Sequence, residues 1–318
     1  MAGPEPLMPM VVLTNPGSTA NLADAGWLAA LTAAERDLTE LHARTPTEVV
    51  AAVARAVDMG AELIVVNGGD GTVDLVFGAL LARKLPRMPA VAMLPAGKTN
   101  MTAAGWSLSG TKDGALRDLL AARRTAPHRL QTVQRPILRV DGGDQPLFGA
   151  FFGAADVVDG ILFCRRHIYP LGLPNPVSHA AAISIMCWRA LLGFTAQHLE
   201  ADIGGERPAR ESGRFFCVIA TTLDALLLGV QPAPANGGGP IHYLSLRPGP
   251  RALIAATPAL LARRIDTGYR RTVRRADAVT LRFTGAYTLD GELHAASAER
   301  PVSVGVGGHV PIVRLRPP

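Results

Sequence analysis

The hexapeptide Asn67-Gly68-Gly69-Asp70-Gly71-Thr72 constrains the fold more than any other stretch of this chain. It follows a short apolar run at residues 63–66 and precedes an amphipathic run at residues 73–81. This order predicts a strand, a glycine-rich loop and a helix. Glycine lets the backbone turn tightly and approach a ligand closely, and a helix N-terminus offers N–H groups that suit a phosphate. A carboxylate beside a phosphate requires a metal ion or a reacting hydroxyl between them. Asp70 therefore makes this a predicted nucleotide site with a built-in acid.

Two further loops rich in small residues are predicted to lie beside the first. Each follows a predicted strand, at residues 10–14 and 90–94. The loops are Asn15-Pro16-Gly17-Ser18-Thr19 and Pro95-Ala96-Gly97-Lys98-Thr99-Asn100. A weaker strand at residues 38–42 and helices at 22–31 and 112–124 complete an alternating pattern, which predicts a doubly wound parallel sheet. Ligands bind beyond the carboxyl ends of the strands in such a sheet, so we expect the three loops to converge at one edge.

One helix carries a clear start signal. Thr45 is a predicted N-cap, Pro46 suits the first helical position, and Glu48 completes a capping box. Gly60 is expected to end this helix.

From about residue 128 the pattern changes to antiparallel β-structure. A hairpin is predicted from residues 137–140 and 147–152, with an Asp-Gly turn between them. A helix is expected at residues 180–192. Further candidate strands lie at residues 215–221, 241–246, 279–283, 302–306 and 312–315. We therefore expect an α/β domain at residues 1–127, to which a last strand at about 308–318 could return, and a β-rich domain at residues 128–307.

The composition excludes some classes of function. The chain has 318 residues, is 48% hydrophobic, and carries a net charge of +6. With only 5% aromatic residues and no nucleic-acid motif, it is not expected to bind nucleic acid. Its three cysteines are far apart, which fits reduced thiols in a cytoplasmic protein. We expect no signal peptide, and the longest apolar patch, at residues 180–194, is too short to span a bilayer.

Two other motifs carry candidate chemistry. Gly97-Lys98-Thr99 lacks the upstream glycine of a P-loop, because that position is Ala92. Lys98 could still meet a phosphate as a point charge. Asp290-Gly291-Glu292 is either a plain hairpin turn or a pair of carboxylates held by one, of which one accepts a proton and the other holds Mg²⁺ or a partner side chain.

The order of these motifs resembles the diacylglycerol kinase catalytic family, which includes bacterial lipid kinases and sphingosine kinases. The resemblance rests on Asn15-Pro16, Gly68-Gly69-Asp70-Gly71-Thr72, the Pro-x-Gly-x-x-Asn loop at residues 95–100, and Asp290-Gly291-Glu292. It runs over nearly the whole chain, and residues 148–157 and 221–229 also look like second-domain segments of the family. The glycine-rich motif is shared with NAD kinases and phosphofructokinases. The late Asp-Gly-Glu and the β-rich second domain favour the lipid kinases.

The resemblance implies a fold and a set of site residues. The fold would be an N-terminal doubly wound parallel sheet, as in NAD kinases and diacylglycerol kinases, followed by a C-terminal antiparallel β-sandwich for the lipid. Asp290 would be the general base, with Asp70 and Glu292 as further catalytic residues and as metal ligands. The residues implied to bind the nucleotide are Asn15, Pro16, Ser18, Thr19, Gly68, Gly69, Asp70, Gly71, Thr72, Gly97, Lys98, Thr99 and Asn100.

The implied function is an ATP- and Mg²⁺-dependent kinase that phosphorylates a hydroxyl of a diacylglycerol-like or sphingoid lipid. Such an enzyme would be cytoplasmic, peripheral to the inner face of the membrane, and active in phospholipid biosynthesis. The lipid would enter between the two domains. The sequence does not decide whether the protein forms a homodimer. Two alternatives remain: a kinase of a soluble acceptor such as NAD, and a non-catalytic homologue that binds nucleotide or lipid.

Two positions depart from the family pattern. The family has Gly-Thr-Gly-Asn where this chain has Gly97-Lys98-Thr99-Asn100, and Asn-Glu where it has Asp74-Leu75. Both changes fall in the predicted nucleotide contacts, and they are the main support for the non-catalytic alternative.

A basic segment bears on partners. Residues 260–283 carry arginines at positions 263, 264, 270, 271, 274 and 275 among apolar residues. Such a segment is either a surface for anionic lipid or an ordinary solvated face.

Overall fold

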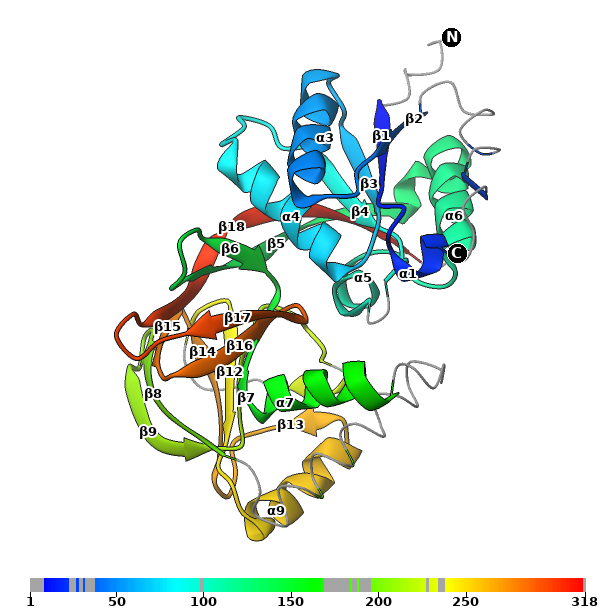
Figure 1. Cartoon of the computed structure of the whole chain (residues 1–318). Helices are drawn as coiled ribbons and strands as arrows, with labels where there is room; N and C mark the ends of the chain where they lie inside the picture. The colour runs from blue at the N-terminus through cyan, green and yellow to red at the C-terminus, as the bar shows by residue number, and fades with distance from the viewer. Residues whose placement is uncertain are drawn as a thin grey trace. The chain divides into compact units, whose positions relative to one another are not determined.

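The computed structural model describes residues 9–22, 27–28, 31, 38–97, 100–168, 184, 188, 196–226, 229–233 and 238–316. The chain divides into two compact units. The first unit comprises Met1–Arg135 and His309–Pro318, and the second comprises Pro136–Gly308. Two strands run through the unit boundaries, β5 (Leu130–Asp141) and β18 (Val302–Leu315) (Figure 1).

The first unit is a parallel sheet with helices on both faces. Its strands pair in the order β2-β1-β3-β4, and the C-terminal part of β18 continues the sheet through Ile312, which pairs in parallel with Val91. On one face α3 and α4 pack together, and on the other α6 packs on the sheet through a shared apolar cluster. Besides parts of β5 and β18, the elements of this unit are β1 (Met10–Thr14), α1 (Thr19–Leu22), β2 (Leu38–His42), α3 (Pro46–Asp58), β3 (Leu63–Asn67), α4 (Asp70–Ala82), β4 (Ala90–Met93), α5 (Met101–Trp106), α6 (Lys112–Thr125) and η1 (Pro127–Arg129).

Local signals in the sequence place α3 correctly. Thr45 is the N-cap, and its hydroxyl accepts a hydrogen bond from the Glu48 N–H at 3.3 Å. The Glu48 carboxylate accepts from the Arg44 N–H at 2.7 Å, one residue earlier than the simplest capping box. This bond lowers the pKa of Glu48. Gly60 follows the helix with a φ of +73°, as a glycine just past a C-terminus should.

The second unit is a sandwich of two antiparallel sheets. One sheet has the order β14-β12-β10-β7-β16-β17, and the other contains the N-terminal part of β18 followed by β15, β8 and β9. One apolar cluster draws on both sheets, with Phe152 and Tyr243 from the first and Leu199 and Val279 from the second. The other elements are β6 (Leu147–Gly149), β7 (Phe151–Ala155), α7 (Asp156–Phe163), the π-helical turn η2 (Cys164–Ile168), β8 (Gln197–Gly204), β9 (Ala209–Phe215), β10 (Cys217–Thr221), β11 (Gln231–Pro232), β12 (Ile241–Leu246), α9 (Pro250–Leu261), β13 (Arg264–Ile265), β14 (Arg271–Ala276), β15 (Ala278–Arg282), β16 (Gly285–Leu289) and β17 (Glu292–Ala296). The predicted fold class is confirmed: a parallel α/β sheet followed by a separate antiparallel region.

Several predicted strands have different limits in the structure. The run predicted as one strand at residues 147–152 is two strands, β6 and β7, in different sheets, because Ala150 between them bonds through its N–H to Asp290 and through its C=O to the Thr222 N–H. The strand predicted at residues 215–221 is divided, because Phe215 ends β9 and β10 starts at Cys217; Phe216 and Cys217 both lie opposite Leu246 of β12. The strands predicted at 302–306 and 312–315 form one strand, β18.

Two predicted helices fall mainly on residues outside the described ranges. The helix predicted at residues 22–31 is described only at residues 22, 27, 28 and 31, all of which are helical, and Leu22 is the last residue of the short helix α1. The helix predicted at 180–192 is described only at Ser184 and Trp188. Within the part of the chain that the structure describes, no helix is long and apolar enough to cross a bilayer.

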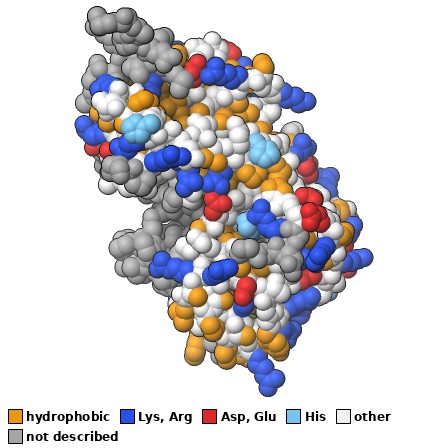
Figure 2. Space-filling view, turned by 180° about the vertical axis from the view of Figure 1, so that it is seen from behind, with side chains coloured by type: hydrophobic (Ala, Val, Ile, Leu, Met, Phe, Trp, Pro, Cys, Tyr) orange, Lys and Arg blue, Asp and Glu red, His pale blue; other side chains and the backbone are white. Residues whose placement is uncertain are grey.

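The basic segment at residues 260–283 is not one amphipathic element. It comprises the end of α9 and three short strands, β13, β14 and β15. Lys and Arg side chains are spread over the surfaces of both units in the view of Figure 2. One arginine of the segment, Arg271, is buried, so the segment is only partly a solvated face.

His242 on β12 is expected to make stability depend on pH. The pKa of His242 is lowered to about 4, first by burial and then by the charge of Arg275, whose guanidinium contacts the His242 Nε2, whereas Asp224 opposes the shift. Because the folded pKa lies below the usual 6.5, the unfolded state takes up this proton first as the pH falls. We expect His242 to cost about 2 kcal/mol or less of stability between pH 6.5 and pH 4, allowing for its partial exposure.

The measurement is urea unfolding across this pH range for the natural protein and for His242→Gln. The variant should lose less stability on acidification than the natural protein. Equal losses in the two proteins would show that His242 does not carry this pH dependence.

Candidate active site

Three loops leave the same edge of the parallel sheet. In the paired register Thr14 lies opposite Asn67, and Val66 lies opposite Met93, so β1, β3 and β4 end side by side. The loops that follow these strands are the three predicted from the sequence. The sheet therefore brings together segments that are about eighty residues apart in the chain.

The first loop is bonded to the second by side chains at its two ends. The Asn15 amide Nδ2 donates to the Thr72 hydroxyl at 2.9 Å, and the Asn15 Oδ1 accepts from the Gly17 N–H at 2.9 Å. The Ser18 hydroxyl accepts from the Gly69 N–H at 3.2 Å. Asn15 and Ser18 therefore fix the shape of the glycine-rich loop from outside it.

The second and third loops meet through glycine. A Cβ added to Gly97 would lie 2.7 Å from the Cα of Gly69, and one added to Gly68 would lie 2.7 Å from the Cβ of Thr72. Real side chains do not fit at these distances, so both positions require glycine. The third loop is closed by Asn100, whose Oδ1 accepts from the Gly97 N–H at 2.7 Å and whose Nδ2 donates to the Gly97 carbonyl at 2.8 Å.

Helix α4 begins at Asp70, and its N-cap is Gly69, which has no side chain to cover the first turn. The Gly69 carbonyl accepts from the N–H groups of Thr72 and Val73. The start of a helix carries backbone donors and a positive dipole end, so this first turn suits an anion. Asp70 places a carboxylate at the same point.

Two residues that support these loops were missed by the sequence analysis. The buried Asn21 donates through its Nδ2 to the carbonyl of Asn15 at 2.9 Å and to that of Asn67 at 3.0 Å. The Lys112 ammonium donates to the Ala20 carbonyl at 2.7 Å and lies over the ring of Trp27. Both residues bond mainly to backbone carbonyls brought close by the fold, and no motif marks such a contact in the sequence.

Replacing Asn21 with alanine is expected to loosen the first two loops. The carbonyls of Asn15 and Asn67 each lose one of two donors, and two hydrogen bonds should together be worth about 1–3 kcal/mol of stability. The affinity for ATP should fall at the same time, by roughly tenfold. Thermal unfolding and ATP titration measure the two effects, and Leu22→Ala, an exposed neighbour on α1, is the matched control. Unchanged values for Asn21→Ala would show that this side chain does not hold the loops.

In the second unit Asp290 and Gly291 form the two-residue turn between β16 and β17. Their φ angles are +46° and +93°. Positive values at both central positions are the mark of a type I′ hairpin turn, which favours Asp-Gly. The plain hairpin interpretation of this motif is therefore right as a description of the backbone.

The same turn holds the Asp290 carboxylate in one place. Its Oδ2 accepts from the Ala150 N–H at 2.6 Å, and the Asp290 N–H donates to the Phe151 carbonyl at 2.8 Å. The Ala150 carbonyl in turn accepts from the Thr221 hydroxyl at 2.8 Å. A Cβ on Gly149 would lie 2.1 Å from Asp290 Oδ2, so this approach also requires glycine. Asp290 is only 9% exposed, and its carboxylate is thus oriented by strand β7 and its neighbours.

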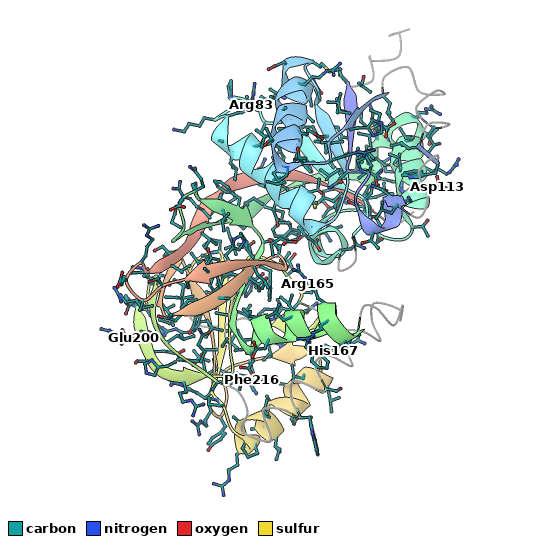
Figure 3. The ribbon with its side chains drawn as sticks, in the orientation of Figure 1. Arg83, Asp113, Arg165, His167, Glu200 and Phe216 are labelled. Carbon is teal, nitrogen blue, oxygen red and sulfur yellow. The ribbon has the colours of Figure 1, made fainter. Side chains whose placement is uncertain are left out.

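Glu292 differs from Asp290 in its surroundings. Its side chain is mostly exposed, and its Oε1 lies 3.5 Å from the Arg165 guanidinium. Arg165 also donates to the Gly291 carbonyl at 2.8 Å, and Figure 3 shows it between η2 and the β16–β17 turn. An exposed pair at this distance contributes little to stability. Arg165 was not predicted as a site residue, and it supplies a cation beside the Asp290-Gly291-Glu292 turn.

His294 follows on the same strand, and its ring stacks on that of Tyr287 at 5.3 Å between centroids. Burial lowers the pKa of His294, and the nearby charge of Glu292 opposes this shift. Burial also raises the pKa of Tyr287. Both side chains are therefore neutral near pH 7.

The described residues contain no group of three or more His, Cys, Asp or Glu side chains that could hold a metal ion by themselves. A magnesium ion in a phosphate-transfer site needs only one or two carboxylates, because phosphate oxygens and water supply the other ligands. Asp70, at the first turn of α4, fits that requirement. Lys98 and Thr99, two of the predicted nucleotide residues, lie outside the described residues.

Comparison with known families supports the predicted resemblance. Residues 9–132 match the model of the diacylglycerol kinase catalytic domain. The match covers all three loops of the first unit, and it confirms the resemblance inferred from the motifs. No curated protein matches the chain significantly.

Solved structures resemble the whole chain. Two from Bacillus anthracis str. Sterne, one described as a diacylglycerol kinase and one provisionally so, superpose with TM-scores of 0.63 and 0.67. Each comparison covers 99% of both chains at 14% sequence identity. At this identity the likeness shows a shared fold over both units.

Proposed function

We propose that this chain, whose residues 9–132 match the diacylglycerol kinase catalytic domain, is an ATP- and Mg²⁺-dependent kinase of a lipid hydroxyl. The acceptor class is a diacylglycerol-like or sphingoid lipid. The observation that carries the proposal is the Asp290 carboxylate, held by the 2.6 Å bond from the Ala150 N–H in a unit whose fold is that of structures described as diacylglycerol kinases.

The three loops of the first unit fit the phosphates of a nucleotide. Gly68 and Gly97 leave the backbone bare where a Cβ would collide, which allows phosphate oxygens to approach backbone N–H groups. The first turn of α4 adds its dipole to the same place. Asn15 and Ser18 keep the loop in this shape through the bonds to Thr72 and Gly69.

Asp70 would hold Mg²⁺ together with the phosphate oxygens. When bound, the ion would neutralise charge that develops on the transferred phosphoryl group. Glu292 is a second candidate ligand, and its exposed carboxylate is free to reorient because its contact with Arg165 is long. The contribution of the protein is mainly to position the groups and to stabilise charge.

Asp290 would accept the proton of the lipid hydroxyl at its carboxylate. The bond from Ala150 fixes one carboxylate oxygen, so the orientation of the other is fixed as well. A general base gains from such positioning because proton transfer needs the two heavy atoms within hydrogen-bond reach. Arg165, bonded to the Gly291 carbonyl, would add a positive charge beside this turn.

One experiment tests the lipid kinase proposal against two alternatives, a kinase of a soluble acceptor and a non-catalytic homologue. Purified protein is incubated with labelled ATP and Mg²⁺, in parallel with mixed lipids and with NAD, and the products are identified by mass spectrometry. A phosphorylated lipid with no phosphorylated NAD is the expected result. A phosphorylated NAD would instead indicate a kinase of a soluble acceptor. Binding of ATP without a product from any hydroxylated lipid would overturn the kinase proposal in favour of a non-catalytic homologue.

A further inference from the structure

Helix α9 is apolar on the side that faces solvent as well as on the side that faces the protein. Its inner side packs through Ala252, Leu253 and Leu260 against two apolar clusters of the second unit. Its outer side carries Ile254 and Leu261, which are 66% and 80% exposed and lie seven residues apart on one face. Arg251 is the only charged residue of the helix. Surface helices of soluble proteins normally carry polar side chains on the outer face, so an apolar outer face points to a binding surface.

Arginines surround this apolar face. Arg251 is the second residue of the helix, Arg263 and Arg264 follow the helix, and Arg270 lies in the next loop; all four are exposed. None of the four forms an ion pair with another described residue. Residues 250–276 contain seven arginines and one acidic residue, Asp266. The surface is therefore both apolar and strongly positive.

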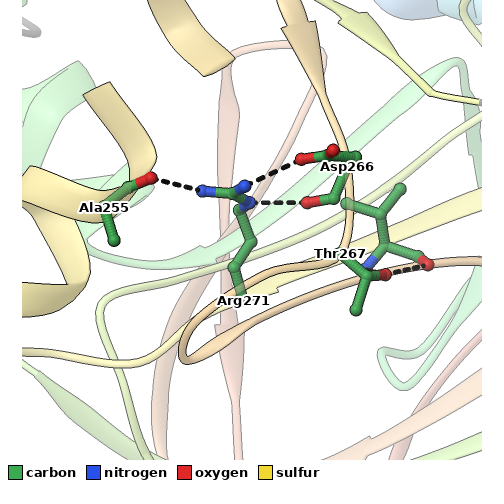
Figure 4. A network of polar contacts seen from close by, with 5 residues as sticks. Ala255, Asp266, Thr267 and Arg271 are labelled. Atoms are coloured by element: carbon green, nitrogen blue, oxygen red, sulfur yellow. Dashed lines mark hydrogen bonds and ion pairs between the residues drawn. The ribbon is translucent and has the colours of Figure 1, made fainter. Parts of the chain in front are cut away.

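The single acidic residue of this region is already engaged. The buried Arg271 donates from Nη2 to the Asp266 carboxylate at 2.8 Å and from Nε to the Asp266 carbonyl at 2.5 Å (Figure 4). Its Nη1 reaches the Ala255 carbonyl of α9 at 3.4 Å. The negative charge of Asp266 is thus offset by Arg271 and does not reduce the field of the four exposed arginines.

Arg271 also joins α9 to the loop that carries Tyr269. Thr267 in that loop bonds to the N–H and the carbonyl of Val273, which fixes the loop on β14 (Figure 4). Tyr269, 56% exposed, and Arg270 are therefore held at a fixed place relative to α9. In Figure 2 orange and blue side chains lie next to one another at the lower end of the second unit, where Figure 1 draws α9.

We infer that the outer face of α9, with Arg251, Arg263, Arg264 and the loop of Tyr269, docks on an anionic lipid membrane. Ile254, Leu261 and Tyr269 would enter the interface, where apolar and aromatic side chains are favoured. The exposed arginines would meet the lipid phosphates, because a basic surface is attracted to an anionic leaflet. Charge complementarity selects this occupant over an apolar protein groove. The inference does not depend on phosphoryl transfer, since docking requires no nucleotide.

The test is sedimentation of the full chain with lipid vesicles in the absence of ATP. Vesicles of phosphatidylcholine alone are compared with vesicles that also contain phosphatidylglycerol, at low and at raised salt. The natural protein should bind the anionic vesicles more tightly, and salt should weaken that binding. Absence of binding to anionic vesicles at low salt would overturn the proposal.

Two pairs of substitutions locate the surface. Ile254→Ser with Leu261→Ser should weaken vesicle binding by on the order of tenfold. Arg263→Gln with Arg264→Gln should weaken it by about fivefold per arginine. The control for the apolar pair is Val50→Ser with Met59→Ser, exposed apolar residues on and next to α3. The control for the arginine pair is Arg87→Gln with Arg300→Gln, which changes the net charge by the same amount. If the site variants bind vesicles as tightly as their control variants do, the docking surface is not on α9.

Two further measurements separate membrane docking from catalysis and from self-association. Phosphorylation of a short-chain, water-soluble diacylglycerol should be unchanged in all four double variants, so a failed kinase proposal and a failed docking proposal give different results. Sedimentation equilibrium shows whether the chain self-associates. If the Ile254 and Leu261 variant loses self-association while it keeps vesicle binding, the face binds a second copy and the membrane proposal is wrong.

Discussion

Replacing Asp290 with asparagine is expected to lower the turnover of lipid phosphorylation by at least ~100-fold, the usual scale for loss of a general base. Asparagine has nearly the same shape, and its amide oxygen can still accept from the Ala150 N–H. Its amide cannot take a proton from a hydroxyl. The affinity for ATP should stay unchanged, because the three loops of the first unit do not include this residue.

The hairpin turn should accept asparagine at position 290 without a loss of stability. Asn-Gly is the sequence that a type I′ turn favours most, and asparagine tolerates the φ of +46° at position 290. The variant should therefore fold as well as the natural protein, and its melting temperature should not fall. A loss of turnover at unchanged stability would separate a base from a residue that only shapes the turn.

The control is Glu299→Gln, which removes the charge of an exposed carboxylate in the same unit and outside the proposed site. Turnover of this control should equal that of the natural protein. Turnover of Asp290→Asn close to the natural value would leave only the structural role of the turn, and the proposed base would be wrong.

Replacing Gly97 with alanine is expected to lower the affinity for ATP by roughly tenfold or more. The new Cβ would lie 2.7 Å from the Cα of Gly69 and 3.1 Å from the Asn100 Oδ1. The first neighbour is backbone, so the two loops would have to separate, at a cost of about 1–3 kcal/mol. The phosphate-binding shape of the loops depends on their close approach, and nucleotide affinity should report its loss.

Gly305→Ala is the matched control, because a Cβ at this position meets nothing within 4 Å. Isothermal titration with ATP and thermal unfolding, carried out on both variants, distinguish a local effect from a general one. Unchanged ATP affinity in Gly97→Ala would show that the second and third loops do not act together on the nucleotide.

Much of the first unit could be predicted because its signals are local. The cap of α3 involves Thr45 and Glu48, three residues apart, and the three loops follow strands whose apolar pattern is continuous. The carboxyl ends of parallel strands meet at one edge by topology alone. The predicted loops therefore lie together in the structure although their roles toward the nucleotide remain a proposal.

The second unit was harder because its decisive contacts are distant in the sequence. Ala150 ends β6 by bonding to Asp290, 140 residues further along the chain. Residues 147–152 are apolar or small throughout, so their pattern cannot show where one strand stops and the next begins. Arg271 is a similar case, because in the sequence it is one of several arginines in a basic segment, and only the structure shows it buried against Asp266 and Ala255.

Strand β18 has a consequence for how the protein is made. Its C-terminal part completes the sheet of the first unit beside β4, and it is fixed there by Ser107, whose hydroxyl accepts from the Met93 N–H and donates to the Val313 carbonyl. The Arg129 guanidinium also donates to the Arg316 carbonyl. During synthesis these residues leave the ribosome only after the whole second unit has been translated. Until then β4 is an open strand edge on a nascent chain, the kind of surface that chaperones cover and that misassembly exploits.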